Sequence, residues 1–329
     1  MAGNLWSGGS IYQGTDKIYK HSGGTSTITT SFSAPGDSLQ GLTWDGTNLW
    51  STDNSTDKIY KHSGGTSTIT TSFAGPGSAC YGLAWDGTNL WSCDLTSDKI
   101  YKHSGGTVTI TTSFSSPASL PTGITWDGTN LWSCDYTAEK IYKHSGGTST
   151  ITTSFSTLIT RVSGLTWSGQ NLWSSYSVDV NKIYEHSGET STIITSFSGQ
   201  GTYVVALAWE WTAVAPTVTT QAATSIKHVI ATGNGNITDN GFASITQHGV
   251  CWKLGSDPVD IAGSDGSTTE GAGVKGAFTS DMTGLTVSST YYYRAYATNS
   301  VGTSYGAAQT FKTLMPRHAF INFQNPGIF

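Results

Sequence analysis

The sequence Gly-Leu-Thr-Trp-Asp-Gly-Thr-Asn-Leu-Trp occupies residues 41–50. Its Asp45-Gly46 pair separates two apolar runs, and because both residues tolerate positive φ, the pair predicts a tight turn between antiparallel strands. A third run, residues 58–61, ends at a Ser-Gly-Gly turn, and a fourth, residues 66–73, is rich in the β-branched residues that favour strands. Residues 41–73 therefore predict four short strands in succession.

The same unit occurs five times. A His-Ser-Gly element and a first-strand tryptophan each recur in steps of 41, 41, 41 and 42 residues, at His21, His62, His103, His144 and His186 and at Trp44, Trp85, Trp126, Trp167 and Trp209. Four strands in about 40–45 residues are typical of a β-propeller blade. The chain begins within a second strand, at Trp6, and the last copy is followed by a first strand, residues 204–209. Pairing of these two segments would remove two open sheet edges, so we predict a closed five-bladed propeller over residues 1–212.

Packing between blades is the role we predict for the repeated tryptophans, because a buried indole stabilises a fold through its large apolar area. Stacking against a ligand is the alternative. For the five histidines, which lie beside Ser-Gly turns, we favour a role in the turn over a ring of metal ligands. The structural core is predicted to contain Trp6, Trp44, Trp50, Trp85, Trp91, Trp126, Trp132, Trp167, Trp173 and Trp209.

Composition excludes several classes of partner. Charged residues make up 11% of the chain and the formal net charge is -5, so there is no basic footprint for nucleic acid. We expect no secretory signal at the N-terminus, since repeat sequence begins at once, and no membrane insertion, since no long apolar run occurs. The lysines of the repeated Lys-Ile-Tyr-Lys segments are interpreted as solvated strand ends. Buried free thiols, rather than a redox or metal pair, are predicted for Cys80, Cys93, Cys134 and Cys251.

The repeat resembles known propeller families. Leu42-Thr-Trp-Asp-Gly-Thr-Asn-Leu-Trp50 followed by Lys58-Ile-Tyr60 is similar to the repeats of bacterial and phage propellers of the NHL and glutaminyl-cyclase-like groups, and the architecture is similar to the five-bladed lectin tachylectin. Residues 213–313 resemble fibronectin type III-like modules of bacterial surface and phage proteins, through Pro216–Thr220, His248–Trp252 and Tyr291–Ser300. That resemblance implies an immunoglobulin-like β-sandwich, with Trp252 in its core and alternating burial along residues 291–297.

Candidate sites are few. Residues 314–329 form an aromatic C-terminal tail, whose Phe320, Phe323 and Phe329 could dock on a neighbour. Divergence from the repeat clusters in the last copy, where it marks a candidate partner-binding patch, although drift in a terminal blade is the simpler explanation: Arg161, Tyr176, Asp179, Asn181, Glu185 and Glu189. No nucleophile elbow, phosphate loop or metal-binding His-Glu motif occurs, so we expect no catalytic residue, no metal and no cofactor.

A Thr-, Ser- and Gly-rich, weakly charged chain without a secretion signal fits a tailed-phage virion protein. Such proteins are made in the host cytoplasm and become extracellular when the cell lyses. We therefore expect a non-enzymatic virion accessory protein: a capsid decoration, head-fibre or tail-fibre subunit. The sandwich or the tail would contact other virion proteins, and the propeller would face the host surface or a glycan. Two alternatives stay open: a secreted lectin or adhesin with one sugar site per blade, and a glutaminyl-cyclase-like or lyase enzyme.

Overall fold

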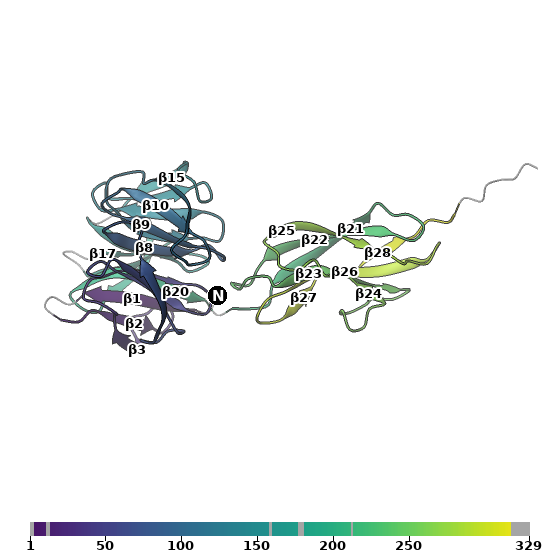
Figure 1. The fold of residues 1–329 in the computed structure, drawn as a ribbon, viewed down its shortest axis with the longest axis horizontal. Coiled ribbons are helices and arrows are strands. Elements are labelled where there is room, and N and C mark those ends of the chain that lie inside the picture. Colours follow the sequence, from purple (N-terminus) through teal and green to yellow (C-terminus); the bar gives the residue numbers. More distant parts are fainter. Residues whose placement is uncertain (1–2, 11–13, 158–159, 177–180, 212, 317–329) are drawn as a thin grey trace, which may run out of the picture. The chain divides into compact units, whose positions relative to one another are not determined.

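The computed structural model describes residues 3–10, 14–157, 160–176, 181–211 and 213–316. All regular elements in these ranges are β-strands, and they belong to two compact units, residues 1–212 and 213–329 (Figure 1). No helix that could span a membrane occurs among the residues described. The predicted all-β chain with repeated four-stranded antiparallel sheets is confirmed.

The first unit contains five four-stranded sheets, here called blades 1 to 5. Each blade is a meander in which consecutive strands pair, except that the first strand of blade 1 comes from the end of the unit. Blade 1 is β20 (Tyr203–Trp211), β1 (Gly3–Ser10), β2 (Lys17–His21) and β3 (Ile28–Ser33). Blade 2 is β4 (Leu39–Trp44), β5 (Leu49–Asp53), β6 (Lys58–His62) and β7 (Ile69–Ala74).

The other three blades repeat this pattern. Blade 3 is β8 (Cys80–Trp85), β9 (Leu90–Asp94), β10 (Lys99–His103) and β11 (Ile110–Ser115). Blade 4 is β12 (Pro121–Trp126), β13 (Leu131–Asp135), β14 (Lys140–His144) and β15 (Ile151–Ser156). Blade 5 is β16 (Val162–Trp167), β17 (Leu172–Tyr176), β18 (Lys182–His186) and β19 (Ile193–Ser198).

Contacts between first strands arrange the blades around a common axis. The strand β4 contacts β8, β8 contacts β12, β12 contacts β16, β16 contacts β20, and β20 contacts β4. Two ends of the ring follow from the strand directions. The turn face carries the Asp-Gly turns of blades 2 to 4, the corresponding Ser168-Gly169 turn of blade 5, and the Ser-Gly turn after the third strand of every blade. The connection face carries the segments between blades and the loops between second and third strands.

The two ends of this unit meet in blade 1. The strands β1 and β20 are antiparallel, with Leu5 opposite Trp209 and Trp6 opposite Ala208. The Trp6 indole Nε1 donates a hydrogen bond of 2.8 Å to Glu210, and the Lys20 ammonium lies 2.7 Å from the same carboxylate. The Trp6–Glu210 hydrogen bond joins residues 204 positions apart in the sequence, and the Lys20–Glu210 ion pair joins residues 190 positions apart.

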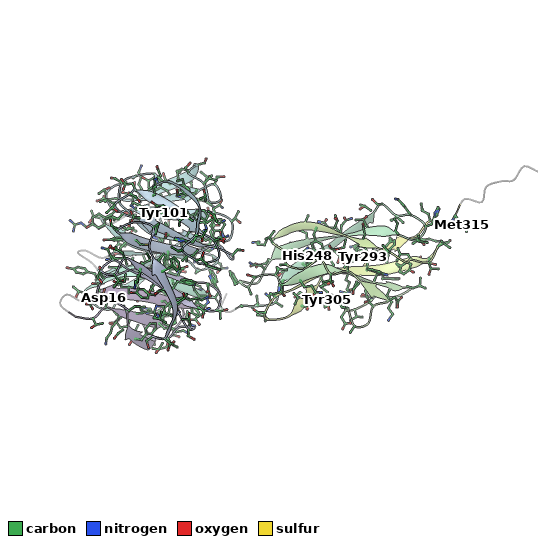
Figure 2. The ribbon with its side chains drawn as sticks, in the orientation of Figure 1. Asp16, Tyr101, His248, Tyr293, Tyr305 and Met315 are labelled. Carbon is green, nitrogen blue, oxygen red and sulfur yellow. The ribbon has the colours of Figure 1, made fainter. Side chains whose placement is uncertain are left out.

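The second unit contains two antiparallel sheets around one core. One sheet is β21 (Thr217–Thr224), β22 (Ala231–Asp239) and β25 (Gly276–Met282). The other is β24 (Gly266–Ser267), β23 (Gln247–Leu254), β26 (Thr290–Thr298) and β27 (Thr303–Tyr305), with β28 (Gln309–Lys312) also paired to β26. Both sheets supply the core, which includes Val218, Met282, Trp252 and Tyr293; Tyr293 is labelled in Figure 2. Along β26, burial alternates as expected from Tyr291 to Ala295, but Tyr296 is buried as well, so the alternation ends before Ala297.

We expect Glu210→Ala to lower the free energy of unfolding by about 1–3 kcal/mol, because it leaves the buried Trp6 indole N–H without an acceptor. Glu210→Gln keeps an acceptor and should cost less. The matched control is Glu189→Ala, which removes a more exposed carboxylate from its ion pair with Lys143 and should cost at most about 1 kcal/mol. Urea unfolding followed by tryptophan fluorescence measures all three. Equal losses for the Glu210 and Glu189 variants would contradict a special role for the pair in blade 1.

Candidate functional site

A serine and a histidine lie side by side in every blade. The histidine ends the third strand, and its Nε2 is 2.7–2.9 Å from the hydroxyl of a second-strand serine. Its Nδ1 is 2.8–3.1 Å from the carbonyl oxygen of a threonine in the following turn. The pairs are Ser7 and His21, Ser51 and His62, Ser92 and His103, Ser133 and His144, and Ser174 and His186.

The chemistry of these pairs follows from their partners. A carbonyl oxygen only accepts hydrogen bonds, so Nδ1 carries the proton and Nε2 accepts from the serine hydroxyl. Burial lowers the pKa of all five histidines, and that of His103 and His186 to about 4. The imidazoles are therefore neutral at pH 7. Although a serine facing a neutral imidazole could form a nucleophile and base, the histidines are at most 1% exposed, which leaves no access for a substrate.

The histidines thus do more than the turn role predicted for them. Each side chain connects the second strand, the third strand and the following turn of its own blade. Each also contacts a phenylalanine from the outermost strand of the preceding blade: His62, for example, lies 5.5 Å from Phe32 between ring centroids. The repeated histidine is a structural residue that links neighbouring blades.

A second repeated cluster joins an aspartate, a tryptophan and a lysine on the turn face. In blade 2, the Trp50 indole Nε1 donates a hydrogen bond of 2.9 Å to Asp45. The Lys61 ammonium is 3.2 Å from that carboxylate and 5.1 Å from the Trp50 ring centroid. Blades 3 and 4 repeat the cluster with Asp86, Trp91 and Lys102 and with Asp127, Trp132 and Lys143. Only the first lysine of each Lys-Ile-Tyr-Lys segment, such as Lys58, matches the solvated strand end that was predicted.

The ten repeated tryptophans lie between blades. Those of the second strands, Trp6, Trp50, Trp91, Trp132 and Trp173, are at most 2% exposed. Trp50 stacks on Trp85 of the next blade, with ring centroids 6.4 Å apart and planes 14° apart. The first-strand tryptophans Trp44, Trp85, Trp126 and Trp167 are partly buried, and Trp209 is buried.

The ring axis leaves almost no room for a ligand. A glycine in each of β4, β8, β12 and β16 lets neighbouring backbones approach closely: a Cβ on Gly41 would lie 2.1 Å from the carbonyl oxygen of Tyr81. The cavity between the first strands measures about 10 Å³. That volume is roughly what one water molecule needs.

The connection face carries a group of side chains that interrupts the repeat, here called the Tyr–Arg patch: Tyr81, Tyr136 and Arg161. Arg161 is exposed, and its guanidinium carbon lies 5.6 Å from the Tyr136 ring centroid. Tyr81, near the start of β8, is partly buried against the core between blades 3 and 4, and burial, with a smaller contribution from Tyr136, raises the pKa of its phenol. Three neighbouring blades contribute one residue each.

The predicted partner-binding residues do not form one site. Arg161 belongs to the Tyr–Arg patch, whereas Glu185 and Glu189 lie on the turn face of blade 5. Asp179, Phe320, Phe323 and Phe329 lie outside the described residues. Tyr176 is 2% exposed and packs edge-on against Tyr184, with centroids 5.2 Å apart, so its prediction as a surface contact is wrong. The reason is its position: Tyr176 takes the place of Asp53, Asp94 and Asp135, which are also buried.

Sequence reasoning missed Tyr81 and Tyr136 because it searched the last copy alone. Both residues occupy positions that are not aromatic in the neighbouring copies: Tyr81 corresponds to Gln40 and Thr122, and Tyr136 corresponds to Asn54 and Leu95. Comparing all five copies position by position would have found them. Among the described residues, no group of three or more His, Cys, Asp or Glu side chains is placed to hold a metal ion. The four cysteines are buried and free.

Comparisons with known proteins report the fold and no family. No protein-family model and no curated protein matches the sequence. Among solved structures, glutaminyl cyclase from Myxococcus xanthus is 14% identical over 52% of this chain and 69% of that chain, with a TM-score of 0.41. A nidogen/laminin complex is 14% identical over 64% and 99% of the two chains, with a TM-score of 0.46. The WD40 β-propeller domain of Doa1 is 13% identical over 53% and 57%, with a TM-score of 0.40.

We expect stability to fall as the pH drops from about 6.5 toward 4. The folded state keeps its histidines neutral down to about pH 4 at His103 and His186, whereas the unfolded chain binds protons below about pH 6.5. Since the unfolded state then holds more protons, acid favours it. Each histidine lowers the free energy of unfolding by up to about 1.4 kcal/mol for each pH unit of acidification in this range. Urea midpoints between pH 7.5 and pH 5 measure this dependence. His103→Asn should be less stable at pH 7.5 and depend less steeply on pH. A midpoint that does not change over this range would contradict the neutral, buried state of the histidines.

Proposed function

We propose that this protein is a bacteriophage virion accessory protein that binds a host surface and performs no catalysis. The role would be that of a capsid decoration, head-fibre or tail-fibre subunit. The Tyr–Arg patch carries the proposal, because it places an exposed arginine and two partly exposed tyrosines on a ring whose repeated polar groups are bonded to one another. Loops and connections on a rigid scaffold are where binding residues concentrate. The Ser–His pairs, which could otherwise support hydrolysis, are buried.

The second unit would provide the attachment to the particle. We assign it to the fibronectin type III-like class, and its arrangement supports the assignment: two antiparallel sheets, of three and of five strands, around one core that contains Trp252 and Tyr293. Its end near residue 314 exposes apolar side chains on three segments that are hydrogen-bonded to one another: Val229, Ile230, Val287, Leu314 and Met315. Exposed apolar groups that gather in this way mark surfaces for protein contact. Together with the aromatic residues 320–329, this end would bind a capsid or tail protein.

The site of synthesis follows from the same proposal. The protein would be made in the bacterial cytoplasm, assembled on the virion, and reach the outside when the cell lyses. It needs no cofactor for this role, and nucleic acid is not among its expected partners.

A lectin or adhesin with one site per blade is the second candidate. Its support is the repetition of partly exposed tyrosines on the third strands, each beside hydroxyl groups, as where Tyr60 donates to Thr56. Binding stoichiometry separates the two candidates. A Tyr–Arg patch takes one ligand per chain, whereas repeated sites take one per blade. Isothermal titration calorimetry of the full chain with a glycan that it binds measures the number of ligands per chain.

We expect the protein to co-purify with virions, at a constant copy number measured by quantitative mass spectrometry. Deleting residues 314–329 should abolish incorporation into particles while leaving the melting temperature of the first unit unchanged, because the two units have separate cores. The control is Lys58→Ala, a substitution on an exposed blade residue, which should be incorporated normally. Particles that lack the wild-type protein would overturn the virion proposal.

A further inference from the structure

We propose that the Tyr–Arg patch binds an anionic saccharide, with the acidic group of the sugar paired to Arg161. This inference rests on the proposed host-surface function and specifies its ligand. The relevant chemistry is a carboxylate, sulfate or phosphate group carried on a sugar that also presents hydroxyls.

Arg161 is the only arginine in residues 1–212. The side chain is exposed, and no ion pair joins it to any residue that the structure describes. By contrast, the second lysine of each segment in blades 1 to 4 is paired with a carboxylate: Lys20, Lys61, Lys102 and Lys143. The first lysines, such as Lys58, are exposed as well, and Arg161 differs from them because its guanidinium lies over an aromatic ring, that of Tyr136.

Tyr136 orients the guanidinium. Its ring lies 5.6 Å from the guanidinium carbon, a distance at which a cation is attracted to the face of an aromatic ring. A guanidinium held in one plane offers two parallel N–H donors, which match the two oxygens of a carboxylate or two oxygens of a sulfate or phosphate. Less side-chain freedom is then lost when the anion binds.

The two phenols supply the polar groups that a sugar needs. Each hydroxyl can donate and accept a hydrogen bond, as sugar hydroxyls do. Tyr81 comes from the neighbouring blade 3, and its ring packs against the core between blades 3 and 4, in the cluster that contains Trp91 and Cys93. One phenol is thus held firmly by the core and the other by Arg161. An acidic peptide would fit less well, because it lacks hydroxyls close to its carboxylate.

Sequence, and not backbone conformation, sets Arg161 apart from the repeat. Its φ is 65°, and the equivalent Leu120 also has a left-handed φ, of 83°. The equivalent positions carry Ser38, Ala79 and Leu120, so the repeat does not require an arginine here. An exposed charge that the equivalent positions lack, on a connection between blades, is better explained by recognition than by folding.

The test uses the full-length chain on an array with four arms: neutral, carboxylated, sulfated and phosphorylated glycans. We expect binding in at least one acidic arm, and weaker binding as salt is raised from 50 to 500 mM, because salt screens exposed charges. Arg161→Gly removes the charge and suits the left-handed backbone, so the fold is retained. We expect it to weaken binding at least about tenfold. Arg161→Lys keeps the charge without the paired donors, so its affinity for the glycan should lie between that of the wild type and that of Arg161→Gly.

Two further variants make the result specific. Tyr136→Phe keeps the ring under Arg161 and removes one hydroxyl, so we expect a smaller loss than for Arg161→Gly. Lys58→Ala removes an exposed positive charge elsewhere on the ring and should bind like the wild type. Equal losses for Lys58→Ala and Arg161→Gly would overturn the site, because they would show a response to net charge alone.

The outcomes also separate this inference from the proposed function. Binding to neutral glycans that Arg161→Gly does not affect would overturn the acidic ligand and leave the virion function standing. Incorporation into virions with no glycan binding in any arm would also overturn the acidic ligand and leave the virion function standing. Binding to acidic peptides but to no sugar would overturn the saccharide assignment. Absence from virions, together with Arg161-dependent binding to an acidic glycan, would support the inference and overturn the virion role.

Discussion

The pairing of β1 with β20 is the constraint on which the first unit depends. Without it, blade 1 would lack its first strand, and both β1 and β4 would lose a neighbour. An open sheet edge exposes unpaired backbone N–H and C=O groups, so the pairing both completes a sheet and removes two edges. Glu210 adds chemical specificity. It accepts from Trp6 and binds Lys20, as Asp45 does with Trp50 and Lys61 in blade 2. The last strand of the first unit thereby restores a cluster that blades 2 to 4 build from contiguous sequence.

The repeated polar groups serve the ring itself. Serine meets histidine, histidine meets a turn carbonyl, and aspartate meets tryptophan and lysine, with little of this chemistry open to solvent. Buried polar groups of this kind must be hydrogen-bonded, because an unpaired one is costly. A recognition surface on such a ring is therefore sought where the repeat is broken. In blade 5, a departure from the repeat affects a buried side chain. There Ser168 and Glu185 replace the aspartate and the lysine, and the Trp173 indole nitrogen has no hydrogen-bond partner in the structure.

The patterns that predicted the strands were local. The Asp-Gly turn, the Ser-Gly turn and the alternation along residues 291–297 each act within a few residues, and the structure has a turn or a strand at each place. The candidate site was less predictable. Arg161 was recognised as a departure from the repeat, but its contact with Tyr136 spans two blades. Tyr176 was assigned to the surface because it too departs from the repeat, yet it fills a position that is buried in every described copy. Divergence identifies a changed residue and does not reveal the direction of its side chain.

The sequence by itself determined the period of 41 residues, the four strands of each copy and their hairpin turns, because these depend on short-range backbone preferences and on the burial of alternate residues. Only the tertiary structure decided which residues of different blades meet. The second glycine of each Ser-Gly-Gly turn shows the difference: on Gly65, a Cβ would lie 2.3 Å from the Trp6 ring of the preceding blade. The contacts of Glu210 with Trp6 and of Arg161 with Tyr136 were likewise decided by the tertiary structure. Such contacts join residues that are tens to hundreds of positions apart, and no local preference encodes them.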